Sequence, residues 1–349
     1  MNIPKVMKGI ELLGYGDSAQ QRHSNAIPVP KPERGEVLIR VSAAGVNNTD
    51  INTRIGWYAK TDDLSNQGTW SGGAMDFPRI QGADVCGEIV AVGPQVESNR
   101  VGERVIIEPC LQESKGERLK TPWYFGSECN GGFSEYTCVA ARHAWKVESS
   151  MSDVELASFP CSYSTAENML IRSQVCSKDT VLISGASGGV GSAAVQLAKA
   201  RGASVIGITS PSKNQQLLEL GCDHVISRDA DLIKQLGVNS VDVVIDLVAG
   251  KQWPQFLEVL RPGGRYAVSG AIGGPLVELD VRTLYLKDLS FFGCTVLGSG
   301  VFKSLIEHIE QGRITALVAK TFALHDINAA QAYFLEKQHV GKIVLEVGE

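Results

Sequence analysis

A short apolar run that breaks into a glycine-rich turn is the feature that most constrains this chain. Residues 181–183 read Val-Leu-Ile, residues 184–191 read Ser-Gly-Ala-Ser-Gly-Gly-Val-Gly, and a helical pattern continues to residue 200. A second strand pattern at 204–208 closes a strand–helix–strand unit. Glycines at such a turn let backbone N–H groups approach a pyrophosphate. The sequence therefore predicts a dinucleotide site, and its loop residues are Gly185, Ala186, Ser187, Gly188, Gly189, Val190 and Gly191.

The end of the second strand pattern selects the cofactor. An NAD site places a carboxylate there for the ribose 2′-OH, whereas an NADP site offers cations and hydroxyls to a 2′-phosphate. This chain has Thr209, Ser210 and Lys213 at that point and no acid, and Arg228 follows the next strand pattern. The alternative is a solvated polar loop. The residue types favour NADPH over NADH.

Length and pattern predict two domains. The 349 residues are too many for one ordinary core. Short apolar or alternating runs between 37 and 147 are typical of a β-rich domain. Strand and helix patterns then alternate, with strands expected at 180–184, 204–208, 223–227, 241–246, 264–269 and 289–295. These six strands predict an α/β fold with a doubly wound parallel sheet, over residues 153–299. The β-rich domain is expected at 1–152, completed by 300–349.

Charge and composition exclude several classes of function. The net charge of −5 and the lack of a basic run argue against a nucleic-acid partner. No 18-residue apolar stretch indicates a membrane span, and the first residues lack the apolar core of a signal peptide. The eight cysteines show no C-x-x-C spacing, which is typical of free thiols in a reducing compartment. A cytoplasmic protein is expected.

Five further motifs, in a fixed order, carry a resemblance to a known family. The chain resembles the medium-chain dehydrogenase/reductase superfamily and, within it, the zinc-free, NADPH-dependent quinone oxidoreductase branch that includes zeta-crystallin. This resemblance implies a GroES-like first domain, a Rossmann second domain and an active site in the cleft between them. The motifs are Ala-Gly-Val-Asn-Asn-Thr-Asp at 44–50, Gly-Ala-Asp-Val-Cys-Gly-Glu-Ile at 82–89, Val-Gly-Glu-Arg-Val at 101–105, Gly-Gly-Phe-Ser-Glu-Tyr at 131–136 and Leu-Arg-Pro-Gly-Gly at 260–264.

The positions that bind catalytic zinc in related alcohol dehydrogenases differ in this chain. By the resemblance, Asn47 and Ala83 stand where those enzymes have a Cys and a His, and only Cys161 matches. One thiolate and a neutral amide do not replace three protein ligands. We therefore expect no metal. The alternative is an alcohol dehydrogenase with atypical ligands, such as Asp84 and Cys161 with a remote histidine.

Without a Lewis acid, a conjugated acceptor is the easier substrate. Hydride added to the β-carbon of a quinone or an α,β-unsaturated carbonyl compound moves charge to an oxygen that hydrogen bonds can stabilise. The resemblance places Asn47, Asn48 and Tyr58 around that event, with Tyr58 as hydrogen-bond or proton donor. Alternatively, Tyr58 packs with Trp57 at the domain edge. Asp50 is expected to hold its loop together, and Asp84 to be a turn residue.

Strand ends in the second domain complete the predicted cofactor contacts. Val248 and the turn at Gly270 and Ala271 follow strands, so they are expected beside the nicotinamide ribose. Lys342, in the family's Gly-Lys-Ile-Val tail, is either a cofactor contact or a surface cation. Cys161 is either a reactive thiol or inert packing.

Three questions stay open at this point. A noncatalytic NADPH-binding protein is a second class of function, because fold does not imply function. A homodimer is expected, with the strand at 289–295 pairing with its copy. The shape of the acceptor site depends on Trp57, Tyr58, the region near Trp123 and the loop at 61–76, which is either a lid or an insertion.

Overall fold

The computed structural model describes residues 3–60 and 68–348, and it divides into two compact units. Unit 1 comprises Met1–Cys161, Ala316–Gln338 and Lys342–Glu349, and unit 2 comprises Ser162–Thr315 and His339–Gly341. The chain therefore leaves and re-enters the β-rich unit later than residues 152 and 300, where the sequence pattern suggested.

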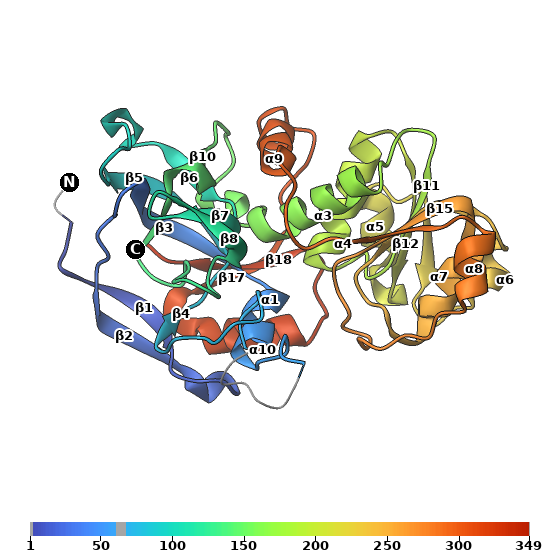
Figure 1. Cartoon of the computed structure of the whole chain (residues 1–349), viewed down its shortest axis with the longest axis horizontal. Coiled ribbons are helices and arrows are strands. Elements are labelled where there is room, and N and C mark those ends of the chain that lie inside the picture. The colour runs from blue at the N-terminus through green and yellow to red at the C-terminus, as the bar shows by residue number, and fades with distance from the viewer. Residues whose placement is uncertain (1–2, 61–67, 349) are drawn as a thin grey trace. The chain divides into compact units, whose positions relative to one another are not determined.

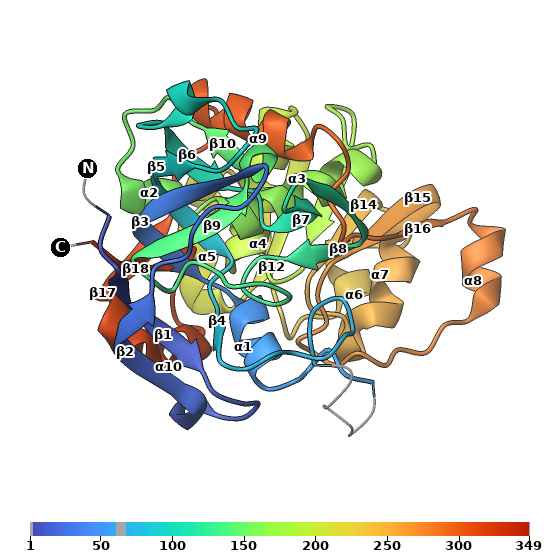
Figure 2. The same cartoon turned by 60° about the vertical axis from the view of Figure 1, so that its left-hand side comes forward.

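Unit 1 is built mainly on antiparallel strands. Its main sheet has the order β10-β6-β5-β3-β18-β17, with β9 also paired to β3, beside a β2-β1-β4 sheet and a β7-β8 hairpin. Figures 1 and 2 show α10 beside β17. The elements are β1 (Val6–Leu12), β2 (Gln21–Pro28), β3 (Glu36–Val46), α1 (Asn48–Arg54), β4 (Arg79–Ile80), β5 (Asp84–Val92), β6 (Arg104–Ile107), β7 (Cys110–Ser114), β8 (Glu117–Tyr124), β9 (Tyr136–Ala140), β10 (Ala144–Lys146), α2 (Asp153–Leu156), β17 (Val318–Ala323), α10 (Ile327–Leu335) and β18 (Lys342–Glu346).

The last strand lies inside this sheet, although it is the final element of the chain. β18 pairs antiparallel with β3 and parallel with β17. Ile343 and Leu345 on β18 are fully buried, as are Val37 and Ile39 on β3. The C-terminal residues therefore contribute to the core of unit 1.

Unit 2 is a doubly wound parallel sheet, as the sequence predicts. All its strands are parallel, in the order β13-β12-β11-β14-β15-β16, which is the order of a dinucleotide-binding sheet. Helices α4 and α5 lie on one face, and α6 and α7 on the other (Figure 1). The elements are α3 (Pro160–Arg172), which begins in unit 1, β11 (Thr180–Ile183), α4 (Gly189–Ala200), β12 (Ser204–Thr209), α5 (Asn214–Leu220), β13 (His224–Ser227), α6 (Leu232–Leu236), β14 (Val241–Asp246), α7 (Trp253–Val259), β15 (Leu260–Val268), α8 (Val281–Leu286), β16 (Ser290–Gly293) and α9 (Val301–Glu310).

The sequence of the central strands explains their position. Val181, Leu182 and Ile183 on β11 are 0% exposed, because helices cover both faces of the sheet. All six strands expected from the pattern are present, with ends that differ by a few residues. Among the described residues, no helix is both long enough and apolar enough to cross a bilayer.

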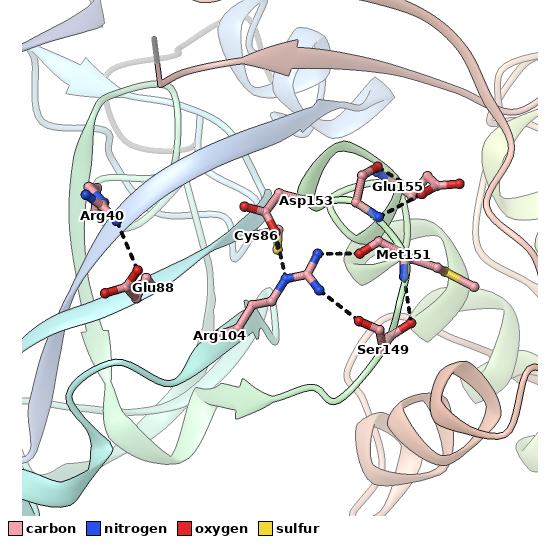
Figure 3. Close-up of polar contacts among 9 residues, drawn as sticks. Arg40, Cys86, Glu88, Arg104, Ser149, Met151, Asp153 and Glu155 are labelled. Carbon is pink, nitrogen blue, oxygen red and sulfur yellow. Dashed lines mark hydrogen bonds and ion pairs between the residues drawn. The ribbon is translucent and has the colours of Figure 1, made fainter.

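An arginine anchors the segment that leads out of the unit 1 sheet towards α2. Arg104 on β6 donates to the carbonyls of Ser149 and Met151 and to Asp153 Oδ1 at 2.6 Å (Figure 3). Cys86 Sγ lies 3.6 Å from the same carboxylate oxygen. One side chain therefore fixes the backbone that continues to Cys161.

Replacing Arg104 with alanine is expected to lower the free energy of unfolding by about 1–3 kcal/mol, because three acceptors lose their donor. The matched control is Arg40→Ala, which removes an ion pair with Glu88 whose side chains are 41% and 36% exposed (Figure 3). That change should cost less than about 1 kcal/mol. Urea unfolding of both variants checks this, and equal losses would contradict the anchoring role.

Candidate functional site

The centre of unit 1 is a buried carboxylate that joins four distant parts of the sequence. Asp84, at the start of β5, is fully buried. Its Oδ2 accepts from Lys342 Nζ at 2.7 Å and from Asn47 Nδ2 at 2.8 Å, and its Oδ1 accepts from Cys161 N at 2.6 Å. Lys342 Nζ also donates to Asn47 Oδ1 at 2.5 Å. We call Asp84, Lys342, Asn47 and Cys161 the Asp84 cluster.

Strand register brings this cluster together. Asp84 is opposite Gly45 on β3, and Ile343 on β18 is opposite Val46. A Cβ atom on Gly45 would lie 2.6 Å from Asp84 Oδ2, so only glycine leaves room for the carboxylate. Asp84 is thus an ionic centre rather than the turn residue that the sequence suggested. Lys342 is 2% exposed, which excludes the surface-cation alternative.

The side chains of Asn47 and Asn48, which the sequence predicts to act together, have different hydrogen-bond partners. Asn47 is buried, and its amide is engaged with Asp84 and Lys342. Asn48, at the start of α1, accepts from Lys337 Nζ at 3.1 Å. Asp50 binds the backbone N–H groups of Asn47 at 2.8 Å and Ala83 at 3.2 Å, so it caps α1 and holds its loop together. Burial raises the pKa of Asp50 to about 7.

Two tyrosine hydroxyls lie beside this cluster. Tyr58 donates to Thr49 Oγ1 at 3.0 Å, and Tyr124 OH lies 3.0 Å from Cys161 Sγ. Burial raises the pKa of both tyrosines, so both hydroxyls keep their protons at neutral pH. Trp57 and Tyr58 also contact each other edge to face, with ring centroids 5.6 Å apart. Tyr58 therefore makes both the packing contact with Trp57 that the alternative predicts and a hydrogen bond through its hydroxyl.

In unit 2 the glycine loop has the geometry that a dinucleotide needs. Gly185 follows β11 with φ +58°, and Gly188 caps the N-terminus of α4. A Cβ on Gly191 would lie 2.2 Å from the carbonyl oxygen of Gly185, so the helix packs closely against the turn. The first turn of α4 directs N–H groups outward that the helix itself does not use. Gly185, Ala186, Ser187, Gly188, Gly189, Val190 and Gly191 therefore form one loop suited to a pyrophosphate.

A second buried carboxylate fixes the adjacent strand end. Asp246, the last residue of β14, accepts from Ser184 Oγ at 2.5 Å and Tyr266 OH at 2.6 Å. It also accepts from the backbone of Val248 and Ala249 at 2.9 and 3.0 Å, and Ala249 has φ +55°. The turn that carries Val248 is thus held in one conformation.

The turn after β15 packs on this one. A Cβ on Gly270 would lie 2.6 Å from the carbonyl oxygen of Leu247, and Gly273 N donates to the carbonyl of Val248 at 2.8 Å. Ala271 is half-buried in the same turn. The predicted residues Val248, Gly270 and Ala271 therefore lie together at the carboxyl ends of neighbouring strands.

Two cations lie near the end of β12, where the residues that distinguish NADP from NAD are expected. Arg228 N donates to the carbonyl of Thr209 at 2.8 Å, and Lys213 Nζ lies 3.5 Å from Ser187 Oγ. Burial and the neighbouring Arg228 lower the pKa of Lys213. Ser210 lies between Thr209 and Lys213 in sequence and is half-buried. Two cations that act on one another electrostatically favour a bound anion.

The donor set of unit 1 does not fit a catalytic zinc ion. Asn47 and Ala83 supply no thiolate or imidazole. Within residues 3–60 and 68–348, no group of three or more His, Cys, Asp or Glu side chains is arranged to hold a metal ion. The ammonium of Lys342 is instead the cation bound by Asp84.

Comparison with known proteins identifies the family. The profile described as alcohol dehydrogenase GroES-like domain matches residues 33–149, and that described as zinc-binding dehydrogenase matches residues 189–311. An acryloyl-coenzyme A reductase of Metallosphaera sedula is 30% identical, and the alignment covers 97% of this chain and 99% of the relative. The chain belongs to the medium-chain dehydrogenase/reductase superfamily. Relatives in this superfamily carry the names of reductases, alcohol dehydrogenases and quinone oxidoreductases.

Other members of the superfamily are similar over most of the chain. Human quinone oxidoreductase is 29% identical over 84% of this chain and 82% of its own. A Sinorhizobium meliloti 1021 protein, solved as a candidate alcohol dehydrogenase, is 41% identical with a TM-score of 0.92, over 99% of this chain and 98% of its own. The fold predicted from the sequence is therefore confirmed, and the relatives carry more than one activity.

The sequence patterns do not mark Tyr124 or Asp246 as residues of the site. Tyr124 and Asp246 each follow or end a strand, which is the one local signal at their positions. The sequence predicts a turn residue at Asp84, whereas the structure makes it a buried ionic centre. Their partners are distant in sequence, such as Lys342 for Asp84, and no local pattern reports such pairs.

Alkylation tests the state of Cys161. Burial, together with the Asp84 carboxylate, raises the pKa of Cys161 to about 12. At neutral pH its thiolate fraction is then about a thousandfold below that of an ordinary thiol. Iodoacetamide at pH 7.5 should label the exposed Cys176 first, as read by peptide mass spectrometry. The rate at which Cys161 is labelled should rise tenfold per pH unit. Labelling of Cys161 and Cys176 at the same rate in the folded protein would contradict this prediction.

Proposed function

We propose that this protein transfers hydride from NADPH to a quinone or to the activated double bond of an α,β-unsaturated carbonyl compound, without a catalytic metal. The observation that carries the proposal is the donor set of unit 1. Neutral hydroxyls lie beside the Asp84 cluster and a neutral amide lies within it, where a zinc enzyme needs thiolate and imidazole ligands. Such donors stabilise a distant enolate or quinol oxygen better than they activate a simple ketone.

The residues of unit 1 have distinct roles in this proposal. Tyr58 donates a hydrogen bond to the acceptor oxygen as negative charge develops there, and Thr49 is its partner in the resting state. Lys342 neutralises Asp84, and the two hold Asn47 at the start of α1. When bound, the cofactor supplies the hydride. The protein then supplies orientation, a proton and exclusion of water.

The cofactor is assigned from the cations of unit 2. Burial and the nearby charge of Arg228 lower the pKa of Lys213, at a strand end that lacks the acid of an NAD site. A 2′-phosphate would be held by both, with Thr209 and Ser210 as hydroxyl donors. NADH lacks the 2′-phosphate that these cations would bind.

The Lys213→Ala and Arg228→Ala variants should each weaken NADPH binding about tenfold to hundredfold, as expected for a lost charged hydrogen bond. NADH binding should change less than about threefold, which makes NADH the internal control. Nucleotide fluorescence titration measures both. Equal losses for the two nucleotides would contradict the assignment.

Activity is tested by NADPH oxidation with a panel that contains 1,4-naphthoquinone, cyclohex-2-enone and a simple alcohol–ketone pair. Turnover of the quinone or enone by protein stripped of metal with chelator supports the proposal. The Tyr58→Phe variant should lose about tenfold to thousandfold in kcat, because the proton donor is removed. Turnover of the alcohol–ketone pair alone, dependent on stoichiometric zinc, would overturn it, and so would NADPH binding without any turnover.

We also propose that two copies assemble through the edge of the unit 2 sheet. β16 is the outer strand, and α8 with its flanking segments extends away from the sheet (Figure 2). Leu276 and Leu286 in this region are 91% and 71% exposed. An exposed edge beside apolar side chains favours pairing with a copy. A cytoplasmic location and the absence of nucleic-acid and membrane partners complete the proposal.

A further inference from the structure

The described part of the loop beyond residue 67 is attached to the segment that follows β8. Trp70 N donates to Ser127 Oγ at 2.9 Å, and Ser71 N donates to Glu128 Oε1 at 2.7 Å. The other oxygen of Glu128 accepts from Tyr124 N at 2.7 Å. One carboxylate therefore joins two backbone segments and fixes the position of Trp70 relative to Tyr124.

The two aromatic rings of this attachment pack against each other in a tilted stack. The ring centroids of Trp70 and Tyr124 are 5.0 Å apart, with an angle of 33° between their planes. The far end of Tyr124 is held by Cys161, whose thiol lies 3.0 Å from the hydroxyl. We call the Trp70 and Tyr124 rings the aromatic wall. It is bound at one end to Glu128 and at the other to the Asp84 cluster.

Trp70 differs from the tryptophans that serve the core. Trp253 in unit 2 is 5% exposed, and its indole N–H donates to Tyr266. Trp70 remains partly exposed, although its backbone is fixed by hydrogen bonds. A large apolar ring that is held rigidly and left partly uncovered is suited to contact with a ligand.

The wall lies next to the groups that act on the acceptor oxygen. The Cys161 thiol contacts Tyr124 and lies within electrostatic range of the Tyr58 hydroxyl. A ligand whose oxygen is bound by Tyr58 therefore has an aromatic ring surface nearby in the same unit. Stacking on this surface stabilises a bound flat conjugated ring more than a bound short acyclic chain.

We propose that Trp70, with Tyr124 behind it, is a specificity-determining residue that selects planar ring acceptors, such as naphthoquinones, over acyclic enones. This inference rests on the proposed function and narrows its substrate class. Glu128 is the positioning residue of the wall, because its two oxygens hold the Ser71 and Tyr124 backbones.

The test compares two acceptors in Trp70→Ala. The KM for 1,4-naphthoquinone should rise about tenfold to hundredfold with kcat largely kept, whereas the KM for acyclic 3-penten-2-one should stay within about threefold. Trp70→Phe should recover most of the loss, because it restores a flat ring. Equal changes for the two acceptors, or none for the quinone, would overturn the proposal.

The matched control is Trp145→Ala, on β10 of the same unit. The Trp145 side chain is partly buried, like that of Trp70, and its indole N–H donates to Glu108 Oε2 at 3.0 Å, so its ring is held by a different contact from those of the aromatic wall. This variant should lose stability but keep the ratio of the two KM values. A ratio that changes as much as in Trp70→Ala would show that the loss is a general packing defect.

A binding measurement separates this inference from the proposed function. Calorimetric titration with 2-naphthol, a planar ring that accepts no hydride, should show binding to the wild type that is at least tenfold weaker in Trp70→Ala. If the protein reduces no acceptor but binds 2-naphthol in this way, the proposed reaction is wrong, whereas the proposed role of the aromatic wall in binding planar rings is supported. Equal binding by both proteins, or no binding by either, would overturn the wall.

Discussion

The ion pair between Asp84 and Lys342 is the interaction on which the arrangement of unit 1 depends. Both side chains are buried, and a buried carboxylate is tolerated only when a cation and further donors satisfy it. The amide of Asn47 and the backbone N–H of Cys161 supply those donors. Four segments are thereby fixed around one carboxylate: the start of α1, the start of β5, the start of α3 and the start of β18. Tyr58 and Tyr124 owe their positions to neighbours in this set.

Unit 2 uses the same principle in a second place. Asp246 is buried at the end of β14, and a serine, a tyrosine and two backbone N–H groups satisfy it. Its effect is to hold the turn at Val248 beside the glycine loop. In each unit a buried acid determines backbone shape, while the groups assigned to substrate or cofactor are neutral hydroxyls, backbone N–H groups or cations. In unit 1 a charged pair positions the neutral groups that we propose act on the acceptor, whereas in unit 2 the proposed phosphate contacts are themselves cations.

Much of the fold follows from local patterns, and most of the site does not. The strands of unit 2 and the loop at Gly185 were predictable because apolar runs and glycines report local backbone shape. The helix α10 was missed, although its apolar residues have helical spacing. The role of Asp84 was not predictable, because its partner Lys342 lies 258 positions away. The contact between Trp70 and Tyr124 depends likewise on a carboxylate, Glu128, that no motif marks. The predicted roles of Asn48 and Lys213 stay predictions, since they concern ligands.

The place of β18 within its sheet has a consequence for folding. β3 gains its inner neighbour, and Asp84 its counter-charge, only when residues 342–346 meet segments that lie 258 or more positions earlier. Closing so large a loop costs chain entropy before the contacts that it brings together can form. The strands of unit 2 all lie within residues 180–293, so its sheet needs shorter closures. Unit 2 is therefore expected to fold ahead of the complete sheet of unit 1.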